Sequence, residues 1–197
     1  MKYPNGKKYI KNQKDDTEEK GNVRSLLNAA NRGMSLEEDI NVSNEYYKNK
    51  GIALINKRPT PINIVKVNYN QGARITDAYF ERQSTTDYNG VYRGRYIDFE
   101  AKNTKSSTSF PLSNIGKHQI EHLKNVLKQD GIAFFIICFQ TKNEIYLLDA
   151  SLVIEYYEHG KRKSIPYEVF KEKGVLIKQD YLPRLHYIDA VNALYFK

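Results

Sequence analysis

The sequence predicts an α/β fold in which helices flank a mixed β-sheet. A capping box at 35–38 opens an amphipathic segment that ends at Gly51, and this pattern predicts a helix. An alternating run over 96–102 and a nearly continuous apolar run over 132–139 predict two strands, the second buried on both faces. Residues 113–129 lie between them, and their apolar residues have helical spacing. Helices that alternate with strands in this way are typical of a layered α/β domain.

Shorter patterns predict the remaining elements of the sheet and its helices. Further strands are expected at 52–55 and 144–148, and further helices at 152–158 and 186–196. Residues 87–95 are rich in turn-forming residues, so they are expected to form an irregular approach to the strand that follows. The chain contains no internal repeat that would indicate a solenoid.

One segment does not fit the predicted sheet. Residues 62–67 and 74–82 have the pattern of two extended runs, and the turn signal Asn70-Gln71-Gly72 separates them. This arrangement predicts a hairpin-like excursion from the domain. The excursion carries Lys66 and Arg74, which are candidate DNA contacts, although a solvated surface role suits Arg74 as well.

The composition favours an acidic partner. The chain has 197 residues and a formal net charge of +8, which makes nucleic acid the first candidate and an anionic membrane surface the second. No apolar run approaches the length of about 18 residues that a membrane span requires, and the polar N-terminus does not indicate a signal peptide. The single cysteine, Cys138, excludes an intrachain disulfide and a Cys-rich zinc site, and it suits the reducing cytoplasm.

Half of the surplus charge lies at the N-terminus. The first 33 residues hold eight Lys or Arg against four Asp or Glu and lack apolar periodicity. We therefore expect a flexible basic arm over 1–31 and a folded domain over 32–197. A solvated tail without a role is the alternative interpretation of the arm.

The strand over 96–102 presents two different faces. Alternate residues of a strand point to opposite sides, so the apolar side chains of Ile97, Phe99 and Ala101 share one face. The other face carries Tyr96, Asp98, Glu100 and Lys102. Two acids and a lysine are therefore expected on one side of a strand whose opposite side is buried.

These residue types suit the hydrolysis of a phosphodiester. Carboxylates can hold Mg²⁺, which retains several waters, and a bound metal lowers the pKa of a water and neutralises charge on the phosphate. The ammonium of Lys102 can stabilise the transition state. A second carboxylate could come from Asp87, thirteen residues before Glu100, or from Asp98 on the strand itself. Spacing alone leaves Asp87 and Asp98 as rivals.

The site residues lie among motifs that resemble those of a known family. Asp87, Glu100 and Lys102 resemble the PD-(D/E)xK nuclease motif, and the surrounding strings are similar to those of the RecU family of Holliday-junction resolvases. The resemblance covers nearly the whole chain from residue 32. The matching strings are Tyr3-Pro4-Asn5-Gly6-Lys7, Arg32-Gly33-Met34-x-Leu36-Glu37, Lys57-x-Pro59-Thr60-Pro61, Ser84-Thr85-Thr86-Asp87-Tyr88-Asn89-Gly90, Tyr96-Ile97-Asp98-Phe99-Glu100-Ala101-Lys102, Thr108-Ser109-Phe110-Pro111-Leu112, His118-Gln119-x-Glu121-His122 and Pro183-Arg184-Leu185-x-Tyr187.

The resemblance implies a restriction-endonuclease-like fold with a projecting stalk at about 60–82. It implies a homodimeric, Mg²⁺-dependent endonuclease that cuts four-way junctions symmetrically during DNA recombination and repair, with a recombinase as a possible partner. It also assigns the first acid's role to Asp87 and that of transition-state stabiliser to Lys102. The metal-site residues that it implies are Thr85, Asp87, Glu100 and Gln119.

Some functional assignments stay open on the sequence alone. Lys57 and Arg95 join the two basic residues of the hairpin as candidate DNA contacts, although a solvated surface role suits them as well. Glu37 could face the site or could stabilise the dipole of its helix. His118 and His122 are four residues apart, but their string lacks the His-Glu-x-x-His order of a zinc protease.

Two other functions remain in competition with junction cleavage. A module that binds branched DNA or regulates a recombinase, without cutting, would bind independently of cations. A restriction-type or repair nuclease would cut ordinary duplex as readily as a junction. The complete set of Asp87, Glu100 and Lys102 favours an enzyme over the first of these.

Overall fold

A computed structural model describes residues 35–70, 72–80 and 85–196, so the arm expected over 1–31 lies outside the described residues. The centre of the fold is a six-stranded sheet with the strand order β1-β4-β5-β7-β8-β10. Only β5 and β7 run parallel to each other, so the sheet is mixed. Its strands are β1 (Leu54–Lys57), β4 (Tyr88–Tyr92), β5 (Arg95–Thr104), β7 (Ile132–Phe139), β8 (Glu144–Asp149) and β10 (Val175–Leu176).

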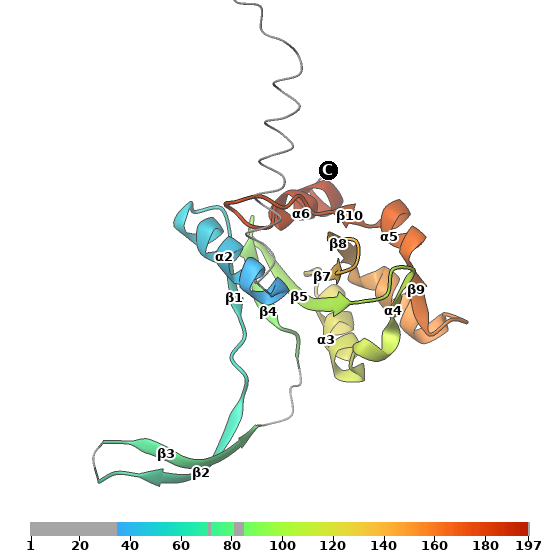
Figure 1. The fold of residues 1–197 in the computed structure, drawn as a ribbon. Coiled ribbons are helices and arrows are strands. Elements are labelled where there is room, and N and C mark those ends of the chain that lie inside the picture. The colour runs from blue at the N-terminus through green and yellow to red at the C-terminus, as the bar shows by residue number, and fades with distance from the viewer. Residues whose placement is uncertain (1–34, 71, 81–84, 197) are drawn as a thin grey trace, which may run out of the picture. The chain divides into compact units, whose positions relative to one another are not determined.

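Five helices among the described residues flank this sheet. Helices α2 and α6 cover one face, and α3 and α4 cover the other (Figure 1). Each face has its own buried core, because β7 contributes alternate side chains to both. The helices are α2 (Leu36–Asn49), α3 (Lys117–Lys128), α4 (Ala150–His159), α5 (Tyr167–Lys173) and α6 (Tyr187–Tyr195).

Local sequence explains how several of these elements begin and end. Gly51 has a φ of 64° after α2, and the N–H of Ile52 donates to the carbonyl of Tyr47 across this turn. This is the left-handed cap expected from the sequence. The parallel pair β5 and β7 is joined through α3, as parallel strands require a crossover connection. Strand β7 is buried on both faces, which confirms the interpretation of its apolar run.

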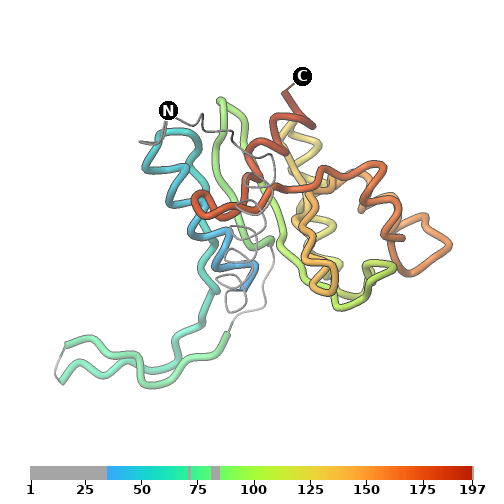
Figure 2. Tube along the Cα trace, turned by 45° about the horizontal axis from the view of Figure 1, so that its top comes forward, coloured from blue at the N-terminus to red at the C-terminus, as the bar shows by residue number. Residues whose placement is uncertain are grey.

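A two-stranded hairpin leaves the sheet between β1 and β4. Strands β2 (Ile62–Asn68) and β3 (Arg74–Phe80) pair only with each other in the described part of the chain. Figures 1 and 2 show the hairpin extending away from the sheet and the helices in both views. The mixed α/β fold with a projecting stalk is therefore confirmed.

Strand β4 differs from the expectation of an irregular approach. The tight turn falls at Arg93 and Gly94, which have φ angles of 49° and 75°, and Asn89-Gly90 lies inside the strand. A Cβ on Gly90 would lie 2.1 Å from the carbonyl oxygen of Leu54. The glycine that indicated a turn is therefore required by the close approach of β1.

The smaller elements complete the domain. Strands β6 (Ser109–Pro111) and β9 (Ser164–Pro166) form a separate pair, and a 3-10 turn, η2, covers Leu112–Asn114. Helix α3 is capped at Gly116, whereas the sequence indicated a cap at Ser113, because η2 takes up the first turn of the expected helix. Among the helices of the described residues, none is long and apolar enough to cross a bilayer.

Candidate active site

The two faces of β5 are divided as the sequence predicted. Ile97, Phe99 and Ala101 pack into the core beneath α2 and α6. Asp98 and Glu100 lie on the opposite face, and their exposed fractions are only 0% and 1%. Buried carboxylates are costly unless they are paired and hydrogen-bonded, so the contacts of each acid indicate what it can do.

Glu100 lies between Asp87 and Lys102. Its Oε1 is 2.7 Å from the ammonium of Lys102, and its Oε2 accepts a hydrogen bond of 3.1 Å from the backbone N–H of Asp87. The Oδ2 atom of Asp87 lies 3.4 Å from the backbone nitrogen of Ala101, which donates to it. The structure therefore brings together Asp87, Glu100 and Lys102, which are the three residues expected to carry catalysis.

The electrostatics of this group favour a cation. Burial, followed by repulsion from Asp87, raises the pKa of Glu100 from 4.5 to about 7, although Lys102 opposes the shift. Two carboxylates that repel each other beside a partly exposed lysine form an incompletely neutralised site. Oxygen ligands of this kind suit Mg²⁺, which takes one or two carboxylates and keeps several waters. Among the described residues, no three Asp, Glu, His or Cys side chains gather closely enough to hold a metal on their own.

Asp98 has a different environment, which we call the Asp98 cluster. Its Oδ2 is 2.5 Å from Arg58, 2.8 Å from the hydroxyl of Tyr96 and 2.9 Å from Nε2 of His122. Its Oδ1 accepts a hydrogen bond from the hydroxyl of Thr86. An ionised carboxylate has about four acceptor positions, and these donors occupy most of them. Of the two rival acids, the geometry thus favours Asp87 as the partner of Glu100.

Two further residues were expected at the metal. Gln119 lies on α3 and is buried, with an exposed fraction of 4%, and its Oε1 accepts a 2.9 Å hydrogen bond from the N–H of Gly116. In this structure the amide therefore takes part in the capping of α3. Thr85 is half-buried and is separated from Asp87 by a single residue. The roles of Gln119 and Thr85 toward a metal stay predictions.

The four candidate DNA contacts lie in different parts of the fold. Lys66 and Arg74 are exposed on the hairpin. Lys57 ends β1 and forms an ion pair with Glu37 at the start of α2, with both side chains about half exposed. Arg95 lies at the far end of β5, where it donates to the carbonyl of Asp130 at 2.8 Å.

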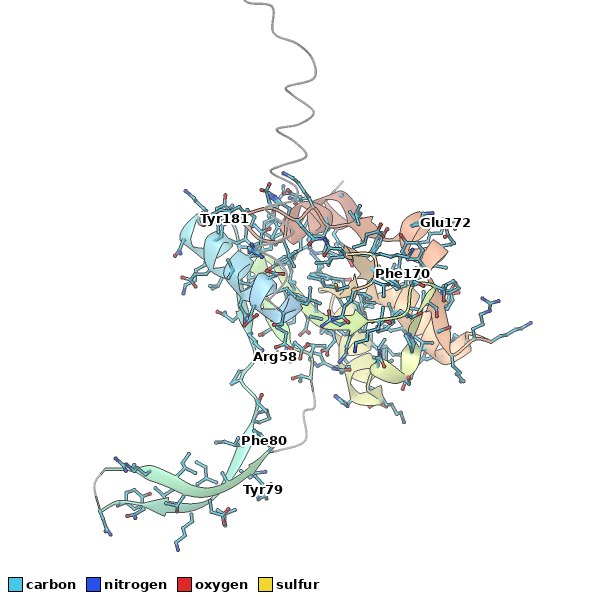
Figure 3. The ribbon with its side chains drawn as sticks, in the orientation of Figure 1. Arg58, Tyr79, Phe80, Phe170, Glu172 and Tyr181 are labelled. Carbon is cyan, nitrogen blue, oxygen red and sulfur yellow. The ribbon has the colours of Figure 1, made fainter. Side chains whose placement is uncertain are left out.

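Sequence reasoning overlooked part of the Asp98 cluster. Arg58 is the unassigned position of the string Lys57-x-Pro59-Thr60-Pro61, and Thr86 appears only within the string that contains Asp87. Arg58 lies where the chain leaves β1 for the hairpin (Figure 3). The sequence predicted burial only for the opposite face of the strand, so it did not indicate that Asp98 requires buried donors. The sequence could not say which donors these are.

Known proteins resemble this chain over its full length. The model of a family described as Recombination protein U matches residues 31–193. A Holliday junction resolvase RecU from Geobacillus sp. (strain WCH70) is 51% identical over 202 residues, covering 100% of this chain and 98% of the relative. The proteins of the same name from Geobacillus kaustophilus (strain HTA426) and Bacillus cytotoxicus are each 50% identical, with the same coverage.

Proposed function

The chain belongs to the RecU family of Holliday junction resolvases, and from this premise we propose that its cutting centre is formed by Asp87, Glu100 and Lys102. The chain is an endonuclease of DNA recombination and repair that resolves four-way junctions. The single observation that supports the proposed centre is the contact of Glu100 with both Lys102 and the backbone of Asp87 on one covered strand face.

The residues of the centre have separate roles in the proposed reaction. Asp87 and Glu100 would hold Mg²⁺, with Thr85 and Gln119 as additional oxygen ligands. When bound, the cation lowers the pKa of a water and neutralises the charge of the phosphate. Lys102 lies within hydrogen-bond distance of Glu100 and is a quarter exposed, so its ammonium can also reach a phosphate oxygen. Lys102 thereby stabilises the negative charge that develops during attack.

The hairpin is the proposed element of junction recognition. It exposes apolar side chains on both strands and in the connection between them, including Tyr69, Tyr79 and Phe80 with exposed fractions of 74%, 61% and 78%. Figure 3 shows Tyr79 and Phe80 on β3. Exposed apolar surface of this extent marks an interaction site, and aromatic rings can stack on DNA bases. Lys66 and Arg74 would contact phosphates beside them.

The proposed enzyme acts as a homodimer in the cytoplasm. A four-way junction has two strands to cut symmetrically, and two equivalent cuts need two equivalent active sites related by a two-fold axis. Lys57 and Arg95 are proposed as further contacts with the arms of the junction, and a recombinase is a possible partner.

A cleavage assay tests the proposed function directly. The full chain is incubated with a labelled four-way junction or a matched linear duplex, in Mg²⁺ or in EDTA. We expect paired nicks in the junction alone and only in Mg²⁺. Equal cutting of the duplex would instead support a restriction-type nuclease. Binding without cutting, unaffected by EDTA, would support a non-catalytic module that binds branched DNA.

A further inference from the structure

Asp98 is completely buried beside the proposed centre, and hydrogen-bond donors occupy most of the acceptor positions of its carboxylate. All four of its donors come from other parts of the chain or from the same strand face: Arg58, Thr86, Tyr96 and His122. A carboxylate with no exposed surface is stable only if such donors are held in place. A buried carboxylate that is held in place also restricts the positions of the side chains that donate to it.

Two of these donors hold the backbone of Asp87. Thr86 directly precedes Asp87 and is itself buried, with an exposed fraction of 3%. Arg58 lies on the other side, where its backbone N–H donates a 2.8 Å hydrogen bond to the carbonyl of Asp87. The carboxylate of Asp98 thus accepts from the hydroxyl of Thr86, which precedes Asp87. It also accepts from the guanidinium of Arg58, whose backbone binds the carbonyl of Asp87.

Among the described residues, the side chain of Asp87 contacts the carboxylate of Glu100, which repels it, and the backbone of Ala101. It is half-buried, and its hydrogen bond with the backbone of Ala101 has a length of 3.4 Å, near the limit for such a bond. The direction of its carboxylate therefore depends on the position of its backbone. That position is set by the contacts of Asp87 with Glu100 and Arg58, and by the hydroxyl of Thr86.

We propose that Asp98 is a positioning residue, which aligns Asp87 with Glu100 through Thr86 and Arg58. This inference rests on the proposed function, because it assumes that Asp87 and Glu100 hold the cation. Residues that orient metal ligands from behind typically change metal affinity or activity about 10–100-fold when they are replaced. Loss of the Asp98 contacts is expected to weaken metal binding within this range and to leave junction binding unchanged.

The same contacts connect the active site with the hairpin. Arg58 directly follows β1, and β2 begins at Ile62, so only three residues separate Arg58 from the hairpin. A shift of the hairpin base on binding a junction would move Arg58, and with it both the carbonyl of Asp87 and the carboxylate of Asp98. Junction recognition and the alignment of the metal ligands thereby share one residue.

Thr86→Val tests the proposal with little change in side-chain shape, and Thr86→Ser restores the hydroxyl. Ser43→Ala is the matched control, because Ser43 is also completely buried and its hydroxyl donates to the carbonyl of Asp39, on α2. Asp98→Asn removes the charge and is the second test. Each variant is prepared as the full chain, and its thermal unfolding is measured first.

Three readouts separate positioning from a general loss of stability. Mn²⁺ affinity is measured by electron paramagnetic resonance without DNA, and the Mg²⁺ concentration for half-maximal cutting is measured with a junction. Hydrogen exchange reports on the amide of Asp87, which donates to Glu100. For Thr86→Val and Asp98→Asn we expect at least tenfold weaker Mn²⁺ binding, a parallel rise in the Mg²⁺ requirement, and faster exchange at Asp87. Thr86→Ser is expected to recover most of each value.

The outcomes distinguish this inference from the proposed function. If Thr86→Val and Asp98→Asn bind Mn²⁺ as Ser43→Ala does, Asp98 does not position the site and the inference is overturned. The proposed function survives that result as long as Asp87→Asn abolishes cutting. If Asp87→Asn still cuts, the proposed centre itself is wrong, and the inference is wrong with it.

Discussion

The raised pKa of Glu100 makes a prediction about stability that does not depend on DNA. Glu100→Gln replaces a buried carboxylate by a neutral amide of nearly the same shape. At pH 8 and without metal, the wild-type carboxylate is ionised, although its burial and the negative charge of Asp87 both disfavour the ionised form. The variant removes this repulsion. We therefore expect Glu100→Gln to abolish cutting and yet to increase the free energy of unfolding.

The expected change in the free energy of unfolding follows from the direction and size of the pKa shift of Glu100. A carboxyl whose pKa is raised on folding binds more protons in the folded protein than in the unfolded chain. Its contribution to stability is complete below pH 4.5 and is lost as the pH rises to about 7. Since each pKa unit corresponds to about 1.4 kcal/mol, the ionised wild type is destabilised by about 3 kcal/mol relative to its protonated form.

Urea unfolding in EDTA between pH 5 and pH 8 measures this effect. The wild type is expected to lose stability across this range relative to Glu100→Gln, and Mg²⁺ is expected to restore the wild type alone. Glu121→Gln is the control, because Glu121 is 61% exposed and should give no such difference. If Glu100→Gln is no more stable than the wild type at pH 8 in EDTA, the electrostatic reasoning about the centre is refuted.

Further predictions concern chemistry, recognition and assembly. Lys102→Met is expected to reduce cutting by about 10²–10³-fold with junction affinity retained, measured by single-turnover cleavage and gel shift; unchanged cutting would exclude Lys102 from catalysis. Tyr79→Ala or Phe80→Ala should weaken junction binding about tenfold or more without lowering the unfolding free energy, whereas Tyr181→Ala, which removes a ring that is 73% exposed outside the hairpin, should leave binding unchanged. Mixed dimers of wild type and Asp87→Asn should nick one strand of a junction without its symmetric partner, and paired cuts by such dimers would contradict the two-site account.

Local patterns explain why much of the fold was predictable. The alternation of β5 placed Glu100 and Lys102 on one face, and the apolar run of β7 indicated burial on both faces, because side-chain direction in a strand depends on local geometry. The helix end at Gly51 followed equally from a local requirement for a positive φ. The short strands β6 and β9 were not predicted, since three residues carry too little periodicity.

The candidate site was predictable only in part, because its arrangement depends on contacts between distant segments. Asp98 and Asp87 could not be distinguished by spacing, and the choice between them came from family resemblance. The structure adds a physical reason for this choice, as Arg58 approaches Asp98 from forty residues away. Gly90 incorrectly indicated a turn, because the glycine is required by the close approach of Leu54 on β1, which lies far from it in the sequence.

Cleavage of a labelled four-way junction by Asp87→Asn in Mg²⁺ tests whether Asp87 holds the cation that cutting requires. Asparagine keeps the size of the side chain and removes the charge that would hold the cation beside Glu100. We expect cutting to be abolished while the variant binds the junction as tightly as the wild type. Cutting at the wild-type rate by Asp87→Asn would contradict the account, because the metal would then be held by other residues.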